Sequence, residues 1–320
     1  MIIGINPSLT TEAFFSGEGP WPMISPKNEA SSLWSAVGNG DVVWYDRPDD
    51  LLWGRWSILL IVDDVPFSQF DGIVAHLHRG GVLPDRAACV ALSGRRFHGQ
   101  RNRAWCVERG NLHLVVHFTP NRPLKKIGHG FTLLPAVAAV RAIRRLSDGA
   151  VNAGMKWVND IVVDHHKVGG FLVSTQTKNG IVEDVVLGLG INIDTVPEVA
   201  ATPFVPTVAC LRDLHAGYSL TTLLPVILSE LQELYNRLLT DGFLPLMKAY
   251  REYAVIIGRT VRIWPETESV SVDELHKVSP LARGVVTAIA DDLSLIIEGH
   301  PDPVTRGRLA EEDACRRFGL

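Results

Sequence analysis

The stretch MKWVNDIVVDHHKVGGFLVSTQTKNGIVEDVVLGLGINI, residues 155–193, decides the fold of this chain. Three runs within it, IVV, FLV and IVEDVVLGLGINI, are rich in β-branched and apolar residues, which is typical of strands. The first two runs are separated by DHHK. The second break contains Asn179-Gly180, a strong hairpin signal. We therefore expect an antiparallel meander of three consecutive strands.

The polar residues of this stretch are unusual for a plain sheet. Lys156, Asn159 and Asp160 lie in a β-rich run, although Lys, Asn and Asp are depleted in strands. Glycine inside a strand often marks the close approach of a ligand or of another backbone, and four glycines fall here: Gly169, Gly170, Gly188 and Gly190. One sheet face would then offer an ammonium, an amide, a carboxylate and bare backbone to an anionic ligand with a flat or bulky body. The alternative is a half-exposed hairpin with solvated charges.

Length, charge and cysteine content limit the class of protein. The chain has 320 residues, more than one typical domain, and a formal net charge of -4, which gives no electrostatic reason to expect nucleic acid or an anionic membrane as partner. The four cysteines, Cys89, Cys106, Cys210 and Cys315, have no metal-type spacing, so free thiols are expected. The N-terminus lacks the features of a secretory signal, and no apolar run approaches about 20 residues. These features predict a cytoplasmic protein.

The first 56 residues show weak periodicity, and we expect an extension packed on the main domain by Trp21, Trp34 and Trp44. They lack the paired amphipathic helices of a helix-turn-helix. From Ser57 the pattern becomes regular. Strands are predicted in SILLIVDDV, RAACVAL and NLHLVVHF, and a helix is predicted from Ser68, a plausible N-cap, to Arg79.

A long basic loop, Ser93–Gly110, separates two of these strands. Loops of this length are usually either functional or disordered. Its guanidiniums lie beside glycines, a combination that suits phosphate, and Phe97 and Trp105 argue against the alternative of a purely solvated loop. The arginines are Arg95, Arg96, Arg101, Arg103 and Arg109. In the strand that follows, His113 and His117 share a face but lack an evident third metal ligand, so we interpret them as a half-buried polar face.

The second half of the chain adds helices and then short strands. Helical spacing covers Phe131–Leu146, Val208–Leu214, Leu220–Leu239 and Phe243–Tyr253. After Tyr253, short strands at turn spacing predict a small barrel of about five strands. The expected organisation is an α+β protein with an N-terminal extension (1–56), a mixed-sheet domain (57–254) and a small C-terminal barrel (255–320).

The order of several motifs now resembles the biotin protein ligases, within the biotin/lipoate ligase superfamily. KWVND at 156–160 is similar to the KWPND of that family, KVGG at 167–170 to its K(L/I)(A/G)G, and GLGIN at 188–192 to its GxGxN. GNL at 110–112 is similar to its GNL, and HGQRNRAW at 98–105 to its RGRRGRxW. The resemblance runs from about Ser57 to Leu309, and the ordered combination is specific although each motif alone is weak.

The chain departs from the family pattern at several positions. Val158 replaces proline, and Phe97, His98, Gln100 and Asn102 stand where the family usually has Gly, Arg, Arg and Gly. The early Ser-Thr-Asn motif is present only as Ser68-Gln69-Phe70, and the usual biotin-reading glutamine falls near Gly94. Arg95 or Arg96 is the candidate to replace the arginine that holds the adenylate phosphate.

The resemblance implies a class II synthetase-like mixed or antiparallel sheet flanked by helices, followed by an SH3-like β-barrel. It implies that biotin and MgATP form biotinyl-5′-AMP, and that biotin then passes to a lysine in the biotin carboxyl-carrier domain of a biotin-dependent carboxylase. The implied catalytic residues are Lys156, Arg101 and Arg103, and Asp160 is a possible contact for Mg²⁺. The implied substrate-binding residues are Ser68, Gln69, Arg95, Arg96, Gly99, Gln100, Trp105, Asn111, Asn159, Asp160, Lys167, Gly169, Gly170, Gly190 and Asn192.

Two alternatives remain open from the sequence. One is a lipoate or octanoate ligase or transferase on the same scaffold, although Trp157 favours biotin. The other is a non-catalytic protein that binds biotin or a nucleotide, because the arginine loop is altered. No nucleic-acid or membrane partner is expected, a repressor function is disfavoured, and a monomer and a homodimer are equally compatible with the sequence.

Overall fold

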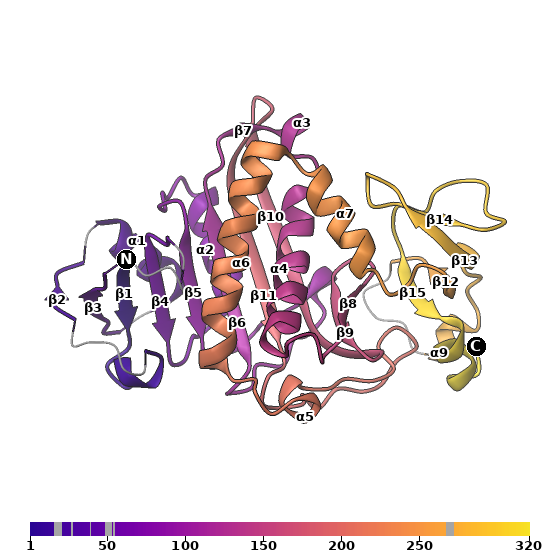
Figure 1. The fold of residues 1–320 in the computed structure, drawn as a ribbon, viewed down its shortest axis with the longest axis horizontal. Helices are drawn as coiled ribbons and strands as arrows, with labels where there is room; N and C mark the ends of the chain where they lie inside the picture. Colours follow the sequence, from indigo (N-terminus) through magenta and orange to yellow (C-terminus); the bar gives the residue numbers. More distant parts are fainter. Residues whose placement is uncertain (16–20, 27, 39, 49–52, 54, 267–271) are drawn as a thin grey trace.

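The computed structural model describes residues 1–15, 21–26, 28–38, 40–48, 53, 55–266 and 272–320. Over these residues, its main feature is an eleven-stranded mixed sheet, shown in Figure 1. The strands are β1 (Ile2–Ile5), β2 (Met23–Ile24), β3 (Val43–Asp46), β4 (Ile58–Val62), β5 (Ala87–Ala91), β6 (Leu112–Phe118), β7 (Arg122–Pro123), β8 (Ala153–Lys156), β9 (Asp160–Val163), β10 (His166–Lys178) and β11 (Ile181–Ile191). Their order is β2-β3-β1-β4-β5-β6-β11-β10-β9-β8, and β7 pairs with β11.

The predicted antiparallel meander is confirmed. β9 pairs with β10, and β10 pairs with β11, all antiparallel. Lys178 faces Ile181 across a two-residue turn whose members, Asn179 and Gly180, have φ values of 51° and 74°. Positive φ at both central residues is the requirement of the tight hairpin turn that Asn-Gly favours.

The first 56 residues extend this sheet. β1 lies parallel to β4 and antiparallel to β3, and β4 lies parallel to β5, so this part of the sheet is mixed. Trp44 on β3 is buried, and the ring of Trp21 meets that of Phe15 edge to face at 4.7 Å. The segment expected as a packed extension is therefore joined to the main sheet by backbone hydrogen bonds.

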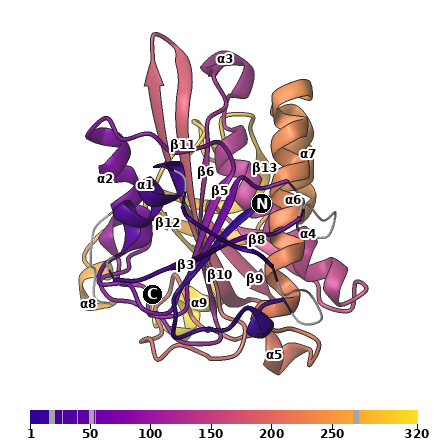
Figure 2. The ribbon, with the colours of Figure 1, turned by 90° about the vertical axis from the view of Figure 1, so that its left-hand side faces the viewer.

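Helices cover both faces of the sheet, as Figure 2 shows. On one face lie α1 (Asn28–Val37) and α2 (Gln69–His78), and on the other lie α4 (Gly130–Leu146), α6 (Leu220–Asp241) and α7 (Leu244–Tyr253). β6 is buried along its whole length because its side chains alternate between the two cores. Leu112, Leu114 and Val116 pack toward α4 and α6, whereas Val115 packs toward α2.

Most predicted helices are confirmed within a few residues. Ser68 caps α2 by accepting a hydrogen bond from the Asp71 N–H. The helix predicted over Val208–Leu214 is shorter, because α5 comprises only Leu211–Leu214. A further short helix, α3, spans Leu124–Ile127. The four cysteines are free, as expected. Over the part of the chain that the structure describes, no helix has both the length and the apolar character needed to cross a membrane.

A second, four-stranded antiparallel sheet follows Tyr253. It comprises β12 (Thr260–Trp264), β13 (Ala282–Ile289), β14 (Leu295–Ile297) and β15 (Arg308–Glu311), in the order β14-β13-β12-β15, with α8 (Val272–Leu275) and α9 (Glu312–Arg317). The structure confirms a small antiparallel unit here, and its closure into an SH3-like barrel stays a prediction. Some adjacent residues, 267–271, lie outside the described part of the chain.

The unit that contains the small sheet packs directly against the KWVND segment and the end of α7. The Trp157 indole donates a hydrogen bond of 2.7 Å to the Leu293 carbonyl. Arg251 at the end of α7 donates to the Ile289 carbonyl and to Asp291, each at 2.7 Å. These contacts hold the small sheet beside the β8–β9 end of the main sheet (Figure 1).

Candidate functional site

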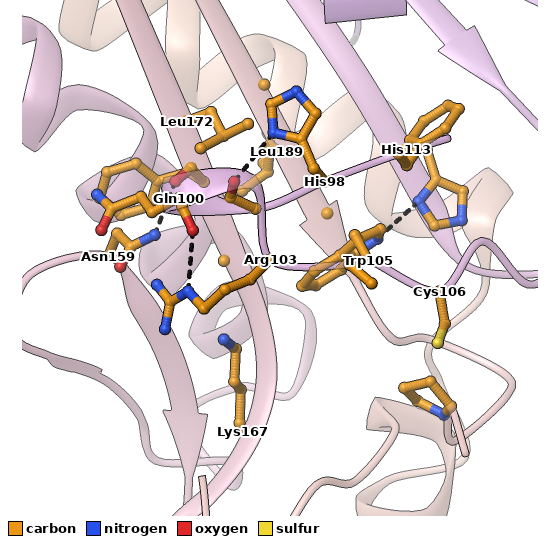
Figure 3. Close-up of a pocket in the computed structure, with 18 of the residues that line it drawn as sticks. His98, Gln100, Arg103, Trp105, Cys106, His113, Asn159, Lys167, Leu172 and Leu189 are labelled. Atoms are coloured by element: carbon orange, nitrogen blue, oxygen red, sulfur yellow. Dashed lines mark hydrogen bonds between the residues drawn. The ribbon is translucent and has the colours of Figure 1, made fainter. Parts of the chain in front are cut away.

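A cavity of about 250 Å³ opens on the α2 face of the sheet, over β6, β10 and β11. Its floor and walls are largely apolar, with rings from Phe70, Phe97 and Trp105 and aliphatic groups from Leu172 and Leu189. Polar groups line the other parts of the cavity: Ser68, Gln69, His98, Gln100, Arg103, His113, Asn159, Lys167, Asn192 and Arg308. Such a lining, apolar with a few polar groups, is typical of a small-molecule site. Figure 3 shows this cavity.

The strand glycines at this cavity make room for aromatic rings. A Cβ added to Gly190 would lie 2.4 Å from the Trp105 ring, and one added to Gly188 would lie 3.0 Å from Phe70. The expected close approach therefore involves side chains of the protein at these two positions. Gly170 is different, because its nearest neighbours, at 3.3 Å or more, include the Asn159 carbonyl and Asp160. Gly169 lies against the Gly190 carbonyl and lines neither of the two cavities described here.

A second cavity of about 210 Å³ adjoins the first. The two share Gln100, Arg103, Asn159, Val205 and Arg308 as lining residues. Over the described chain, the second cavity is lined by three carboxylates and five cationic side chains. The cations are Arg101, Arg103, Lys156, Arg306 and Arg308, and the carboxylates are Asp160, Glu266 and Asp292. The apolar cavity thus adjoins a second cavity whose wall carries more cationic than anionic side chains.

Lys156 lies at the end of β8, buried to 7% exposure, on the wall of the charged cavity. Its ammonium donates a hydrogen bond of 2.5 Å to the Phe204 carbonyl. Burial lowers the pKa of this amine, and the negative charge of Asp160 opposes the effect. An anion in the cavity would stabilise the charged amine, since no carboxylate oxygen is recorded within ion-pair distance of it in the described structure.

Lys167 and Asp160 form an ion pair beside Lys156. The Lys167 ammonium is 2.6 Å from the Asp160 carboxylate and 5.9 Å from the centroid of the Trp105 ring. Figure 3 shows the Lys167 amine directed toward the loop that carries Arg103 and Trp105. Asp160 is therefore positioned by Lys167, and it also faces Lys156 across the β8–β9 pair.

The basic loop Ser93–Gly110 forms one wall of the apolar cavity and is anchored to three distant segments. His98 contacts Asp71 on α2 at 2.9 Å, Arg109 contacts Asp63 at 2.7 Å, and Arg101 pairs with Glu266. The loop also folds on itself, because the Gly99 N–H donates to the Arg103 carbonyl at 2.7 Å. Gly99, implied as a substrate-binding residue, lines the apolar cavity, but its N–H has a partner within the loop.

Comparison with known proteins agrees with this geometry. The family model described as "Biotin/lipoate A/B protein ligase family" matches residues 84–192, which hold the loop, the KWVND segment and the glycine-bearing strands. Residues 84–192 are a domain of the biotin/lipoate A/B protein ligase family. This ligase-family domain lies at the centre of the main sheet and contributes most of the wall of the apolar cavity, whereas much of the wall of the charged cavity comes from residues 204–309.

Sequence relatives and solved structures of biotin ligases resemble a larger part of the chain. A bifunctional ligase/repressor BirA of Bacillus subtilis is 28% identical over 191 residues, 59% of this chain and 58% of the relative. A biotin--[acetyl-CoA-carboxylase] ligase of Paracoccus denitrificans is 23% identical over 203 residues, 63% of this chain and 79% of the relative. The biotin protein ligase of Aquifex aeolicus, solved with biotin and ATP, has the same fold: TM-score 0.59, 15% identity, 80% of this chain and 99% of that one.

The structure brings most of the predicted site residues of the ligase-family domain together, but not all. Arg95, Arg96 and Asn111 line neither of the two cavities described. Asn111 is 1% exposed, and its amide oxygen accepts hydrogen bonds from the N–H groups of residues 193, 194 and 195. Its side chain thus ties the start of β6 to the end of β11, and the expectation that it contacts substrate does not fit this placement.

Two further residues predicted to bind the ligand, Gln69 at the start of α2 and Asn192 after β11, also have structural partners. The Gln69 amide donates to the His113 carbonyl at 2.7 Å and to the Cys89 carbonyl at 3.3 Å. Asn192 donates to the Ala209 carbonyl at 3.1 Å. Both residues still line the apolar cavity.

The two histidines of β6 are more buried than the sequence predicted. His117 is 0% exposed and lies between the Pro84 carbonyl and Asp184, at 2.9 and 2.8 Å. His113 is 3% exposed, and burial lowers its pKa to about 4. No cluster of three or more potential metal ligands is found over the described residues. His113 is therefore a neutral group at physiological pH, facing the Trp105 indole at 3.4 Å.

We expect the contact between His98 and Asp71 to depend on pH. Burial lowers the pKa of His98, but hydrogen bonds to the Gly99 carbonyl and to Asp71 together raise it above 6.5. Because the folded-state pKa is raised, the contribution to stability is fully present below pH 6.5 and is lost as pH rises through the raised value. An NMR titration should give a His98 pKa above 6.5, and Asp71→Asn should move it below that of the parent. A His98 pKa at or under 6.5 in the unsubstituted chain would contradict this contact.

Three parts of the site could not be expected from the sequence. They are the ring of Phe204, the Phe204 carbonyl that holds Lys156, and the guanidinium of Arg308. Both residues lie far along the chain from KWVND, in stretches without a motif. Short strands were predicted after Tyr253, and β15 confirms one of them, but their pattern did not indicate that a side chain enters the site.

Proposed function

We propose that this chain is a biotin–protein ligase of the cytoplasm, which makes biotinyl-5′-AMP from biotin and ATP and passes biotin to a lysine of a carboxylase carrier domain. The names of the relatives support the substrates and the acceptor, including the acetyl-CoA-carboxylase ligase of Paracoccus denitrificans. The division into residues 57–254 for catalysis and 255–320 for a small SH3-like unit belongs to the same proposal.

One observation carries the proposal: an apolar, ring-lined cavity joins a cation-rich cavity at a wall that holds Arg103 and Asn159. The first suits the fused rings and aliphatic chain of biotin, and the second suits the phosphates of a nucleotide. The biotin carboxylate would then meet the α-phosphate at the junction. Lys156 lies on the wall of the second cavity, within reach of that meeting point.

In the first half-reaction, a carboxylate oxygen of biotin attacks the α-phosphorus of ATP. The new P–O bond forms as the bond to the β-phosphate oxygen breaks, which releases pyrophosphate. The two reactants are both anions and repel each other, so a cation between them lowers the barrier, most strongly when charge builds up at phosphorus. Lys156 is proposed for this role, and Arg103 is proposed to bind the phosphates.

In the second half-reaction, the ε-amine of the acceptor lysine attacks the acyl carbon of the mixed anhydride. The C–N bond forms, the C–O bond to AMP breaks, and the amine gives up a proton. The anhydride is vulnerable to water, so closure of the cavity would protect it. The basic loop that walls the cavity, Ser93–Gly110, is proposed to provide this protection.

The carboxylates of the second cavity fit a divalent cation that arrives with the nucleotide. Mg²⁺ is usually held by one or two protein carboxylates together with substrate phosphates and water. Asp160, Glu266 and Asp292 line this cavity, and Asp160 is oriented by Lys167. Mg²⁺ would neutralise part of the phosphate charge, and Asp160 would be its protein contact.

One experiment distinguishes biotin ligation from the two alternative functions, lipoate attachment and non-catalytic binding. Purified protein is mixed with MgATP, biotin and lipoate, and the retained acyl-adenylate is identified by mass spectrometry, with pyrophosphate release measured in parallel. Biotinyl-5′-AMP is the expected product. Lipoyl-AMP instead would assign the chain to lipoate attachment, and tight biotin binding without pyrophosphate release would assign it to a non-catalytic binding protein.

We expect biotin and ATP together to protect the basic loop from proteolysis. Trypsin cleaves after arginine, and the loop offers Arg101 and Arg103. A loop held over a bound adenylate should be cut about tenfold more slowly, because cleavage follows the population of the open loop. The rate is measured by mass spectrometry of the fragments with both substrates, with biotin alone and with neither. Cleavage at equal rates in all three samples would argue against closure.

A further inference from the structure

One basic side chain of the second sheet has no role in the scheme above. Arg308 is the first residue of β15 and pairs in register with Trp264 of β12, so its backbone is fixed by the small sheet. Its guanidinium nevertheless lies on the wall of both cavities. It is half-buried, and its Nε is one of the few buried polar atoms of the described chain without a hydrogen-bond partner.

Over the residues that the structure describes, no ion pair joins this guanidinium to a carboxylate. Its central carbon lies 3.8 Å from the centroid of the Phe204 ring, so one of its faces is covered by an aromatic ring. Burial and, to a smaller extent, the positive charge of Arg103 lower the pKa of Arg308 to about 10, although the negative charge of Asp160 acts in the opposite direction. At physiological pH the group is still cationic. An unpaired buried donor on a cation costs free energy that an anion in the cavity would recover.

Phe204 connects this cation to Lys156. Its carbonyl accepts the hydrogen bond from the Lys156 ammonium, while its ring covers the Arg308 guanidinium. The ring of Phe204 also meets Trp264 edge to face at 5.9 Å, which ties this residue to β12. One residue therefore holds two cations at the wall of the charged cavity, one from the main sheet and one from the small sheet.

We propose that Arg308 is a substrate-binding residue that holds a phosphoryl group of the nucleotide at the junction of the two cavities. The inference rests on the proposed function, and it makes the small sheet a part of the active site. The planar guanidinium can donate two parallel hydrogen bonds to phosphate oxygens, including one from the unpartnered Nε. An anion bound there would contact both sheets and so hold them together.

The test uses the full-length chain and two probes, ATP and inorganic pyrophosphate, in isothermal titration without biotin. Arg308→Ala should weaken binding of both probes at least tenfold, because charge-assisted hydrogen bonds are lost. Arg308→Lys should recover only part of the affinity, since an ammonium keeps the charge but not the fork. Arg316→Ala on α9 is the matched control: it removes an exposed arginine of the same region and should bind like the parent.

The titrations distinguish failure of the Arg308 inference from failure of the proposed ligase function. If the parent forms no acyl-adenylate but binds ATP in an Arg308-dependent manner, the reaction is wrong and the inference stands. Affinity of Arg308→Ala equal to that of the parent, or no binding of either probe by the parent, overturns the inference. Circular dichroism and thermal melting of each variant show whether it is folded, and Arg308→Lys replaces Arg308→Ala if the latter does not fold.

Discussion

Replacement of Lys156 by alanine should reduce biotin-dependent ATP–pyrophosphate exchange by about 100- to 1000-fold, the range found when one preorganised electrostatic contact to a transition state is removed. The ammonium is proposed to sit between two anions, and no other buried lysine lines the charged cavity in the described residues. The fold should be retained. Burial disfavours the charged amine, as its lowered pKa indicates, so removing it relieves a cost of folding.

The matched control is Lys178→Ala. This lysine is the last residue of β10, is exposed at the hairpin, and lines neither cavity. The Lys178→Ala variant should catalyse ATP–pyrophosphate exchange at the rate of the parent. Chemical denaturation should give free energies of unfolding for both lysine variants within about 1 kcal/mol of that of the parent. Exchange at the parent rate in the Lys156→Ala variant would remove this residue from the mechanism, and loss of exchange with loss of folding would make its role structural.

The largest effect on stability is expected at Asn111. Substitution by alanine removes the one acceptor of three backbone N–H groups, those of Ile193, Asp194 and Thr195, at 2.8, 3.0 and 3.1 Å. It also removes the donor to the Thr195 carbonyl at 2.9 Å. Each buried group left without a partner costs about 1–3 kcal/mol, so we expect the free energy of unfolding to fall by about 3 kcal/mol or more.

Urea denaturation followed by tryptophan fluorescence measures this change. Asn28→Ala, at the exposed start of α1, is the control and should change stability by less than about 1 kcal/mol. A further readout separates structure from binding: the residual folded Asn111→Ala protein should bind ATP with an affinity close to that of the parent. Unchanged stability with weakened ligand binding would contradict the structural role and return Asn111 to the substrate-binding residues.

Much of the central sheet follows from local sequence. The Asn179-Gly180 turn, the β-branched runs and the Ser68 cap are each set by neighbours in the chain, and the structure confirms them. The clustering of Lys156, Asp160 and Lys167 also follows, because two short antiparallel hairpin connections bring them together. Local periodicity is a reliable guide where both partners of a contact lie within one meander.

Contacts between distant segments could not be predicted in the same way. Gly99 was implied as a substrate-binding residue, but the loop turns back so that His98 pairs with Ala104 and the Gly99 N–H donates to the Arg103 carbonyl. Gly188 and Gly190 indicated close approach, and the approaching groups are Phe70 and Trp105. In each case the sequence identified an unusual glycine, but the group that contacts this glycine comes from the tertiary structure.

The first and last parts of the chain were the hardest to interpret. β1 pairs with β4 across more than 50 residues, and no sequence pattern predicts a parallel pairing of that separation. Arg308 likewise reaches the site from a sheet whose first strand begins at Thr260, far along the chain from KWVND. The sequence indicated a separate small unit at the C-terminus, and the structure places one of its side chains on the wall of both cavities.

The position of the Lys156 amine with ligand bound tests the central proposal most directly. A crystal structure of the chain with biotinyl-5′-AMP, or with biotin and a non-hydrolysable ATP analogue, would locate it. We predict that Nζ leaves the Phe204 carbonyl and lies within hydrogen-bond distance of both the acyl oxygen and an α-phosphate oxygen. An Nζ that keeps its bond to Phe204 while the ligand occupies the two cavities out of its reach would contradict the proposal.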